Sequence, residues 1–347
     1  MRKLRNLLIL VLAACLLLAA CGEDTPTPVY TDPPEETRAP KDQGQVTILF
    51  TGNVQNIFEK DALPGEIGYA ALAAYRDELE DDGHRVILVD GGNAMAPDGA
   101  GAVRGGKTLA ELIGAVEYDV RVVGETELAF GVAEFDQLTG KMGECTVISC
   151  NLVDGAGRSV FVSYAILECG DRKVGFVGIT SPHAAETLGD ESYGFCQGTG
   201  KDDFYAAVQD AIDAASNAGA DYVIAVGNLG TDPMDSPWTC AEIIANSTGL
   251  TAFLDAGGSV LKGKTVTDLD NYEIPVCGVG SEFHYVGKIT LDLNDGSVKV
   301  DLVTELEDEN SRIAQDAADL AEELVVEEPT EEPTEEPTEE PTEEVIE

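Results

Sequence analysis

Residues 46–56, VTILFTGNVQN, join an apolar run to a polar turn whose side chains can bind a ligand but cannot ionise. The apolar run from Val46 to Phe50 predicts a β-strand. The turn then offers Asn53 and Gln55, two carboxamides separated by one residue. Carboxamides donate and accept hydrogen bonds, but their carbonyl oxygens are weak ligands for transition metals. This turn therefore predicts binding rather than acid–base or metal-assisted catalysis.

Four more polar turns follow apolar runs further along the chain, with the sequences GGNAM, GETEL, GNLG and AGGS. Four carboxylates lie in or beside these turns. Together with Asn53 and Asn93 they form an oxygen-rich set that suits Ca²⁺ or Mg²⁺. The same carboxylates could instead accept hydrogen bonds from backbone amides of the turns. The four are Asp90, Glu125, Glu127 and Asp255.

The three histidines of the chain stand outside these turns. His84 precedes a predicted strand, His183 follows a proline in a loop, and His284 opens a late strand. Zinc, manganese and iron sites depend on imidazole, thiolate and carboxylate ligands. The sequence therefore excludes a two-metal centre built on histidines, and each histidine is interpreted as an ordinary polar residue.

The five turns can meet only if the strands before them end side by side, and the sequence predicts such strands. Apolar runs alternate with amphipathic segments over residues 46–304, which predicts a layered α/β fold with mixed sheets. Ligands in such folds bind at the carboxyl ends of the strands, where these turns fall. The predicted strands are 46–50, 86–90, 118–124, 145–151, a hairpin over 162–180, 221–227, 250–255, 274–280, 284–293 and 298–303. The predicted helices are 68–81, 107–116, 131–142, 202–218, 238–246 and 307–324.

The five turns, in this order and at about these spacings, resemble those of the calcineurin-like metallophosphoesterase domain, in particular the N-terminal half of bacterial 5'-nucleotidases. The resemblance covers about residues 46–302 and implies a layered α/β/β/α sandwich with mixed sheets. It also implies a site in which two metal ions activate a water for attack on a phosphate ester. The framework segments that carry it are GYAALAAYRDEL, VILVDGGNA, ISCNLVD, KVGFVGIT and SPWTCAEIIANSTGL.

The metal-ligand positions of that family are changed in the first three turns. Where the family has Asp and His in the first turn, this chain has Asn53 and Gln55. The bridging Asp of the second turn is Asn93. In the third turn Glu125 replaces the Asn ligand, and Thr126 stands at the position of the catalytic His. The resemblance therefore predicts no catalytic residue in this chain.

The last two turns are changed in the same way. The family's Gly-His turn carries Asn228, and the turn with two His separated by one residue has Gly257 and Ser259. A transition-metal site is not expected to survive these replacements, and activation of water would be lost with the metals. We expect no cofactor. A divalent metal, if one binds, would use the residual oxygen ligands Asp90, Glu127 and Asp255.

The N-terminus has the organisation of a lipoprotein signal. Basic residues precede an apolar run from Leu7 to Ala20, which is too short for a comfortable membrane span. The run ends in LAAC, which resembles the bacterial lipobox. We expect cleavage before Cys21 and lipidation of this residue, which places the protein outside the cytoplasm on the membrane. Cleavage before Cys15 is the alternative, but the mature protein would then begin with several apolar residues that have no evident role.

The ends of the chain lack the apolar residues of a core. The segment after Cys21 is rich in Pro, Thr, Asp and Glu, and the C-terminal segment repeats EEPT. The predicted organisation is a signal peptide at 1–20, a disordered tether at 21–44, the metallophosphoesterase-like domain at 45–305, an acidic helix at 306–326 and a disordered acidic tail at 327–347.

The formal net charge of −44 disfavours nucleic acid as a partner. Three functions remain. The first is a lipid-anchored binding or scaffold protein, with a small phosphorylated or sugar-like ligand, or a protein, as partner. Alternatively, it is an active metal-dependent phosphoesterase or 5'-nucleotidase that acts on extracellular phosphate esters through a rebuilt oxygen-ligand site. The third function is support of an active paralogue. Replacement of all ligand types together favours the first.

Overall fold

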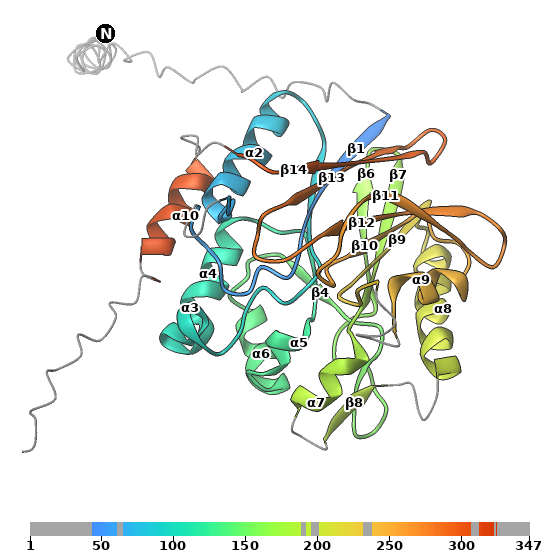
Figure 1. Ribbon diagram of the computed structural model, residues 1–347, viewed down its shortest axis with the longest axis horizontal. Coiled ribbons are helices and arrows are strands. Elements are labelled where there is room, and N and C mark those ends of the chain that lie inside the picture. The colour runs from blue at the N-terminus through green and yellow to red at the C-terminus, as the bar shows by residue number, and fades with distance from the viewer. Residues whose placement is uncertain are drawn as a thin grey trace, which may run out of the picture. The chain divides into compact units, whose positions relative to one another are not determined.

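The computed structural model describes residues 44–60, 65–188, 192–195, 201–231, 238–306, 312–322 and 324 (Figure 1). The predicted signal peptide, the lipidation site Cys21 and the EEPT tail lie outside the described residues. Among the described residues, no helix has the length and apolar character needed to cross a membrane.

Two six-stranded mixed sheets form the centre of the fold. The first has the strand order β14-β13-β1-β2-β3-β4, with β1 to β4 parallel and β13 antiparallel to β1. Its strands are β1 (Gln45–Thr51), β2 (Val86–Asp90), β3 (Val120–Val122), β4 (Thr146–Ile148), β13 (Val286–Asp292) and β14 (Val298–Val303).

The second sheet has the order β11-β12-β10-β9-β7-β6, with parallel strands in the middle and an antiparallel strand at each edge. Its strands are β6 (Tyr164–Cys169), β7 (Arg172–Ile179), β9 (Tyr222–Gly227), β10 (Ala252–Asp255), β11 (Val260–Thr267) and β12 (Glu273–Val279). A separate small sheet pairs β5 (Leu152–Asp154) with β8 (Tyr193–Phe195).

Helices cover the outer face of each sheet, as Figure 1 shows. Over the first sheet lie α2 (Tyr69–Asp81), α3 (Gly99–Ala102), α4 (Lys107–Ala115), α6 (Val132–Thr139) and α10 (Arg312–Glu322). Over the second lie α8 (Lys201–Asn217) and α9 (Cys240–Ala245). The short helices α5 (Glu125–Leu128) and α7 (Ala185–Leu188) lie in loops. The predicted α/β/β/α sandwich with mixed sheets is confirmed.

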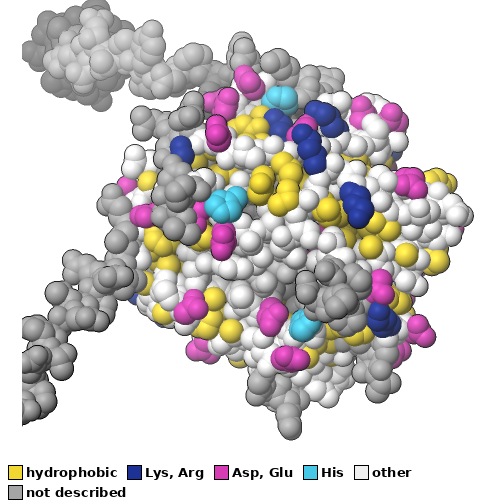
Figure 2. Space-filling model, in the orientation of Figure 1, with side chains coloured by type: hydrophobic (Ala, Val, Ile, Leu, Met, Phe, Trp, Pro, Cys, Tyr) yellow, Lys and Arg dark blue, Asp and Glu magenta, His cyan; other side chains and the backbone are white. Residues whose placement is uncertain are grey.

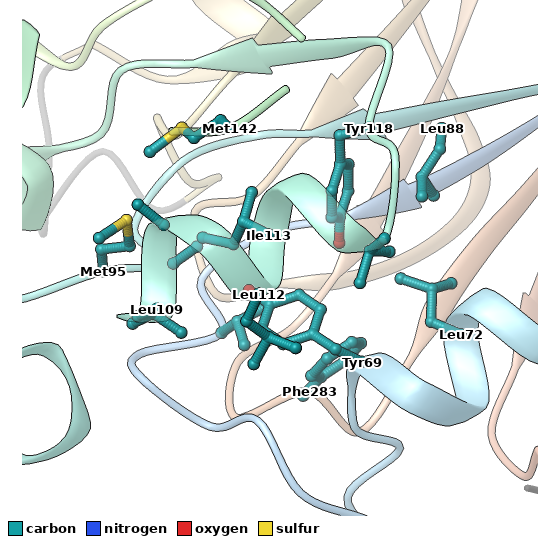
Figure 3. Packing of buried hydrophobic residues seen from close by; sticks show 14 of the residues in the cluster. Tyr69, Leu72, Leu88, Met95, Leu109, Leu112, Ile113, Tyr118, Met142 and Phe283 are labelled. Atoms are coloured by element: carbon teal, nitrogen blue, oxygen red, sulfur yellow. The ribbon is translucent and has the colours of Figure 1, made fainter. Parts of the chain in front are cut away.

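Alternation along β1 shows how the sequence builds these layers. Ile48 and Phe50 are buried between the two sheets, whereas Leu49 faces the helices. Successive side chains of a strand point to opposite faces, so a strand apolar on both faces can lie between two layers. In the helix layer, Figure 3 shows Tyr69 of α2 beside Leu112 of α4. Each such buried side chain contributes about 1.5–3 kcal/mol to stability.

The predicted C-terminal helix is part of this helix layer. α10 contacts α2 and α4, and Ala317, Ala321 and Leu324 are buried in the same core cluster as both helices. Three strands were not predicted. Two are the short strands β5 and β8, and the third is β11, an edge strand with the sequence VLKGKTVT in which exposed and half-buried residues mostly alternate. Polar edge strands lack the apolar run on which the prediction relied.

Acidic side chains are scattered over the face shown in Figure 2. Asp and Glu side chains are spread over this face, whereas most of the visible Lys and Arg side chains lie in its upper part. In the interior, the cysteines behave as small apolar residues. Cys169, Cys240 and Cys277 are buried free thiols, Cys150 is buried and Cys145 is half-buried, whereas Cys196 lies outside the described residues.

Candidate functional site

The five polar turns meet at the carboxyl ends of β1, β2, β3, β9 and β10. The amide of Asn53 donates to the carbonyl of Gly92 at 2.8 Å, which joins the first turn to the second. The amide of Ala256 donates to the carbonyl of Gly227 at 2.8 Å, which joins the fifth turn to the fourth. A Cβ atom placed on Gly52 would lie 2.3 Å from Cβ of Ala256, so the two pairs of turns also touch.

The first two turns hold residues other than glycine in the left-handed conformation. The φ angles are 54° at Asn53, 56° at Gln55 and 58° at Asn93. Asn adopts this region more readily than most residues, but Gln55 has no such preference. The amide of Gln55 donates to the carbonyl of Asn93 at 2.9 Å, and this bond helps to hold the strained backbone. Strain of this kind is concentrated at functional sites.

Asp90, at the end of β2, is bound to a buried arginine. Nη2 of Arg121 lies 3.1 Å from Oδ1 of Asp90, and only 2% and 1% of the two side chains are exposed. Oδ1 also accepts from the amide of Gly92 at 3.0 Å, and Oδ2 accepts from Oγ1 of Thr51 at 2.9 Å. Asp90 therefore has both oxygens engaged inside the protein.

Glu127 joins the third turn to the second in the same way. Its side chain is fully buried, and Oε1 lies 3.7 Å from Nη2 of Arg121. Burial raises the pKa of Glu127, while Arg121 and the hydrogen-bonded amides lower it. Four backbone amides donate to the carboxylate: Oε2 accepts from Asn93 (2.9 Å) and Gly124 (3.0 Å), and Oε1 from Ala94 (2.8 Å) and Met95 (2.9 Å). The carboxylate thus fixes two turns at once.

Asp255, at the end of β10, supports the fourth turn. Its side chain is fully buried, and Oδ1 accepts from the amides of Leu229 and Gly230 at 3.0 and 3.1 Å. Oδ2 makes no hydrogen bond within the described part of the chain. Burial raises the pKa of Asp255 to about 6, against the opposing effect of the turn amides.

Glu125 and the hydroxyl of Ser259 bind other side chains. Oε1 of Glu125 accepts from Oγ1 of Thr187 at 2.8 Å, and the hydroxyls of Ser259 and Thr231 lie 2.7 Å apart. A Cβ atom on Gly257 would lie 1.8 Å from the amide nitrogen of Gly230. This position therefore admits no side chain in the observed backbone.

The carboxamides face one another or the backbone. Oδ1 of Asn53 accepts from Nε2 of Gln55 at 2.9 Å, and Oδ1 of Asn93 accepts from the amide of Thr126 at 3.1 Å. Oγ1 of Thr126 and Nδ2 of Asn228 are buried and make no hydrogen bond to a described residue. Buried polar atoms without a partner indicate a place for water or ligand.

A cavity of about 370 Å³ adjoins the first turn. The residues of the turn continue into its wall, which combines an amide, two apolar side chains and three carboxylates. These are Gln55, Ile57, Phe58, Glu59, Glu66 and Glu282, with Asn56 beside them. Asn56 is already engaged, because its Nδ2 donates to Oδ1 of Asp98 at 2.7 Å and its Oδ1 accepts from the amide of Ala96.

The residues present do not fit a two-metal centre. In the described part of the chain, no group of three or more His, Cys, Asp or Glu side chains could hold a metal ion. The histidines lie elsewhere: Nδ1 of His284 is 3.2 Å from the carbonyl oxygen of Gly65, and His183 lies in a short 3₁₀ helix. The carboxylates at the strand ends accept hydrogen bonds from the turns, which was one of the two interpretations of the sequence.

Sequence reasoning missed Arg121. The residue stands in YDVRVVG, between two valines that are buried, and a charged residue in such a strand requires a buried partner. That signal was present, but it could not identify Asp90 and Glu127 as the partners. The cavity was also missed, because its wall is assembled from three separate segments of the chain.

No profile of a known protein family matches the sequence, and no curated protein matches it. The fold is similar to that of several solved structures. A calcineurin-like phosphoesterase, YfkN from Bacillus subtilis, is 17% identical with a TM-score of 0.64, and the match covers 81% of this chain and 98% of that one. A 5'-nucleotidase precursor from Thermus thermophilus is also 17% identical, with a TM-score of 0.65, over 80% of this chain and 58% of that one.

The NAD nucleotidase of Haemophilus influenzae is 13% identical with a TM-score of 0.59, and the match covers 79% of this chain and 55% of that one. This chain therefore spans little more than half the length of the two nucleotidases. At such low identity the likeness shows the fold, which is that of the calcineurin-like phosphoesterases and 5'-nucleotidases.

Proposed function

We propose that this chain is an extracytoplasmic binding or scaffold lipoprotein, attached to the membrane through Cys21, that uses a metallophosphoesterase fold without hydrolysing phosphate esters. Its partner is a small ligand or a protein that contacts the turns at the strand ends. The two-metal site of the fold is lost, and the turns that would carry it serve as a rigid binding surface.

The contact of Arg121 with Asp90 and Glu127 is the observation that carries this proposal. These carboxylates were two of the three residual oxygen ligands expected from the sequence. A fixed guanidinium lies 3.1 and 3.7 Å from them, and all three side chains are almost completely buried. A divalent cation beside them would meet the positive charge of Arg121 in a medium that screens charge poorly. Cation binding is therefore disfavoured where the expected ligands are concentrated.

Two further features support binding as the function. The left-handed residues Asn53, Gln55 and Asn93 keep a strained backbone at the strand ends. Beside them the cavity has the volume of a small-molecule site, about 300–1,000 Å³ in most proteins. Rigid turns next to a cavity suit recognition of a ligand, whereas hydrolysis by two metals would need ligands at the positions of these amides.

The alternative is an active metal-dependent phosphoesterase or 5'-nucleotidase with a rebuilt oxygen-ligand site. It would rely on Asp90, Glu127 and Asp255, of which Asp255 alone keeps an oxygen without a hydrogen bond in the described structure. A single carboxylate oxygen is far fewer ligands than the six or more oxygens that Ca²⁺ needs or the octahedral set that Mg²⁺ needs.

Metal content and phosphatase activity of the purified full chain separate the two functions. The protein would be incubated with manganese, zinc and calcium in turn, and bound metal measured by elemental mass spectrometry beside a circular dichroism spectrum. We expect a folded protein with no stoichiometric metal and no hydrolysis of nucleotides or other phosphate esters. Two equivalents of a transition metal, with activity that EDTA abolishes, would establish the alternative.

A further inference from the structure

We propose that the cavity beside the first strand-end turn binds a hydroxyl-rich molecule of monosaccharide size that carries no phosphate group. This inference rests on the proposed function, because it names the ligand class of a binding protein. It selects the sugar-like ligand from the two ligand classes, phosphorylated and sugar-like, that the sequence left open.

The charge of the cavity wall argues against a phosphate ester. Glu59, Glu66 and Glu282 line the cavity, and no Lys or Arg is among its lining residues. Glu282 and Glu59 are exposed, whereas Glu66 is almost completely buried. Phosphate sites in proteins supply cations or free backbone amides. Here Arg121 is bound to Asp90 and Glu127, and the amides of the second turn already donate to Glu127. The charged side chains of the lining that a phosphate dianion would meet are all carboxylates, and Nε2 of His284 lies 3.6 Å from Oε2 of Glu282.

The carboxylates and the carboxamide of the cavity wall can form hydrogen bonds with the hydroxyl groups of a ligand. A hydroxyl donates to a carboxylate and both donates to and accepts from a carboxamide, so Glu59, Glu282 and Gln55 can each bind one. Ile57 and Phe58 are half-buried and add an apolar surface on the same cavity. Small-molecule pockets combine apolar walls with a few polar groups that fix orientation. A sugar ring offers both an apolar face and a rim of hydroxyls.

A series of probes on one scaffold tests the ligand class with the purified full chain. Binding of glucose, glucosamine, glucose 6-phosphate and cyclohexylamine would be measured by saturation-transfer NMR and calorimetry at physiological ionic strength. We expect glucose and glucosamine to bind, and glucose 6-phosphate to bind at least about tenfold more weakly than glucose. Glucosamine should bind at least as well as glucose because of the carboxylates.

Three results would overturn the inference. They are equal binding of glucose 6-phosphate and glucose, equal binding of cyclohexylamine and glucosamine, and binding of neither sugar. The second would show that charge alone is recognised, without the hydroxyls. None of these results bears on metal content or phosphatase activity, so the proposed function fails or stands separately.

Two variants place the ligand in this cavity. Glu59→Ala removes an exposed carboxylate of the wall and should weaken glucose binding by about tenfold. Phe58→Leu keeps an apolar side chain but reduces the flat surface, and should also weaken it. Glu134→Ala, which changes an exposed glutamate on α6 outside the cavity lining, is the control and should bind as the parent does. Unchanged binding in both cavity variants, with unchanged melting temperatures, would place the sugar elsewhere and overturn the assignment.

Discussion

Nη2 of Arg121 lies 3.1 Å from Oδ1 of Asp90, and this ion pair is almost completely shielded from solvent. The same nitrogen lies 3.7 Å from Glu127, so one cation is shared by carboxylates from two of the five turns. The arginine thus connects the ends of β2 and β3 to the turn that follows β3. Arg121 therefore supplies the positive charge that holds the second and third turns together.

Removal of Arg121 should therefore be costly. Arg121→Met leaves two buried carboxylates without their cation, and loss of one partner of a buried ion pair destabilises a protein by about 3–5 kcal/mol. Arg172, whose pair with Asp221 at 2.8 Å is partly exposed, provides the control, and Arg172→Met should cost less than about 1 kcal/mol. Urea unfolding of both variants measures the difference, and equal costs would contradict the role given to Arg121.

Glu127 should be as sensitive, for a different reason. Glu127→Gln replaces one acceptor oxygen with an amide group that faces two backbone donors, Asn93 and Gly124 or Ala94 and Met95. We expect a loss of about 2–5 kcal/mol, together with faster hydrogen exchange at the amides of the second turn. The exposed Glu134→Gln should change neither quantity. Normal protection of the turn in Glu127→Gln would show that the carboxylate is not what holds it.

Asp255 should make stability depend on pH. Its pKa is raised to about 6 in the folded protein from an ordinary value of 3.8, so the folded state holds the proton more tightly. Stability from this group is complete below pH 4, falls as pH rises to about 6 and is then constant, with a total loss of about 3 kcal/mol.

Asp255→Asn should remove the pH-dependent contribution of residue 255 to the free energy of unfolding. The measurement is the difference in unfolding free energy between variant and parent from pH 4 to pH 8, with the exposed Asp136→Asn as control. The Asp255→Asn variant should gain stability relative to the parent as pH rises through 5 and 6. A difference that does not change with pH would show that Asp255 titrates normally.

Gly257 should tolerate no side chain. A Cβ atom there would lie 1.8 Å from the amide nitrogen of Gly230, so Gly257→Ala forces the fourth and fifth turns apart and should cost about 1–3 kcal/mol. Gly194 in β8 has no atom within 4 Å of the corresponding position, and Gly194→Ala should be close to neutral. Thermal unfolding compares the two, and equal melting temperatures would contradict the close contact.

Cys21 should be required for membrane attachment. Cys21→Ser removes the residue expected to carry the lipid, so the chain should leave the membrane fraction and lose incorporation of labelled palmitate. Cys15→Ser alters the similar sequence upstream and should keep both properties. Release of the Cys15 variant, with retention of the Cys21 variant, would assign the lipid to the earlier cysteine.

The features that local sequence determines were predicted well. Apolar runs such as VILVD and the hairpin turn at Gly170 and Asp171 depend on neighbouring residues, so most strands of the two large sheets and the five turns were placed from the sequence. Contacts between distant residues were not accessible in this way. Arg121 and Asp90 are 31 positions apart, and Glu59 and Glu282 meet in one cavity only after folding.

The role of the strand-end carboxylates depended on the same distant contacts. From the sequence, Asp90 and Glu127 were candidate ligands for a cation or acceptors of turn amides, and spacing could not decide between the two. Their hydrogen bonds and the guanidinium of Arg121 favour the role of hydrogen-bond acceptor, because each carboxylate is engaged by groups from other elements.

The positive charge shared by Asp90 and Glu127 belongs to a covalently attached side chain. It cannot be removed by a chelator, exchanged for a competing ion or withheld when the surrounding medium is poor in metals. If the chain is exported as we propose, it would thus assemble these turns from its own sequence alone. Its structure should be the same whether trace elements are scarce or abundant.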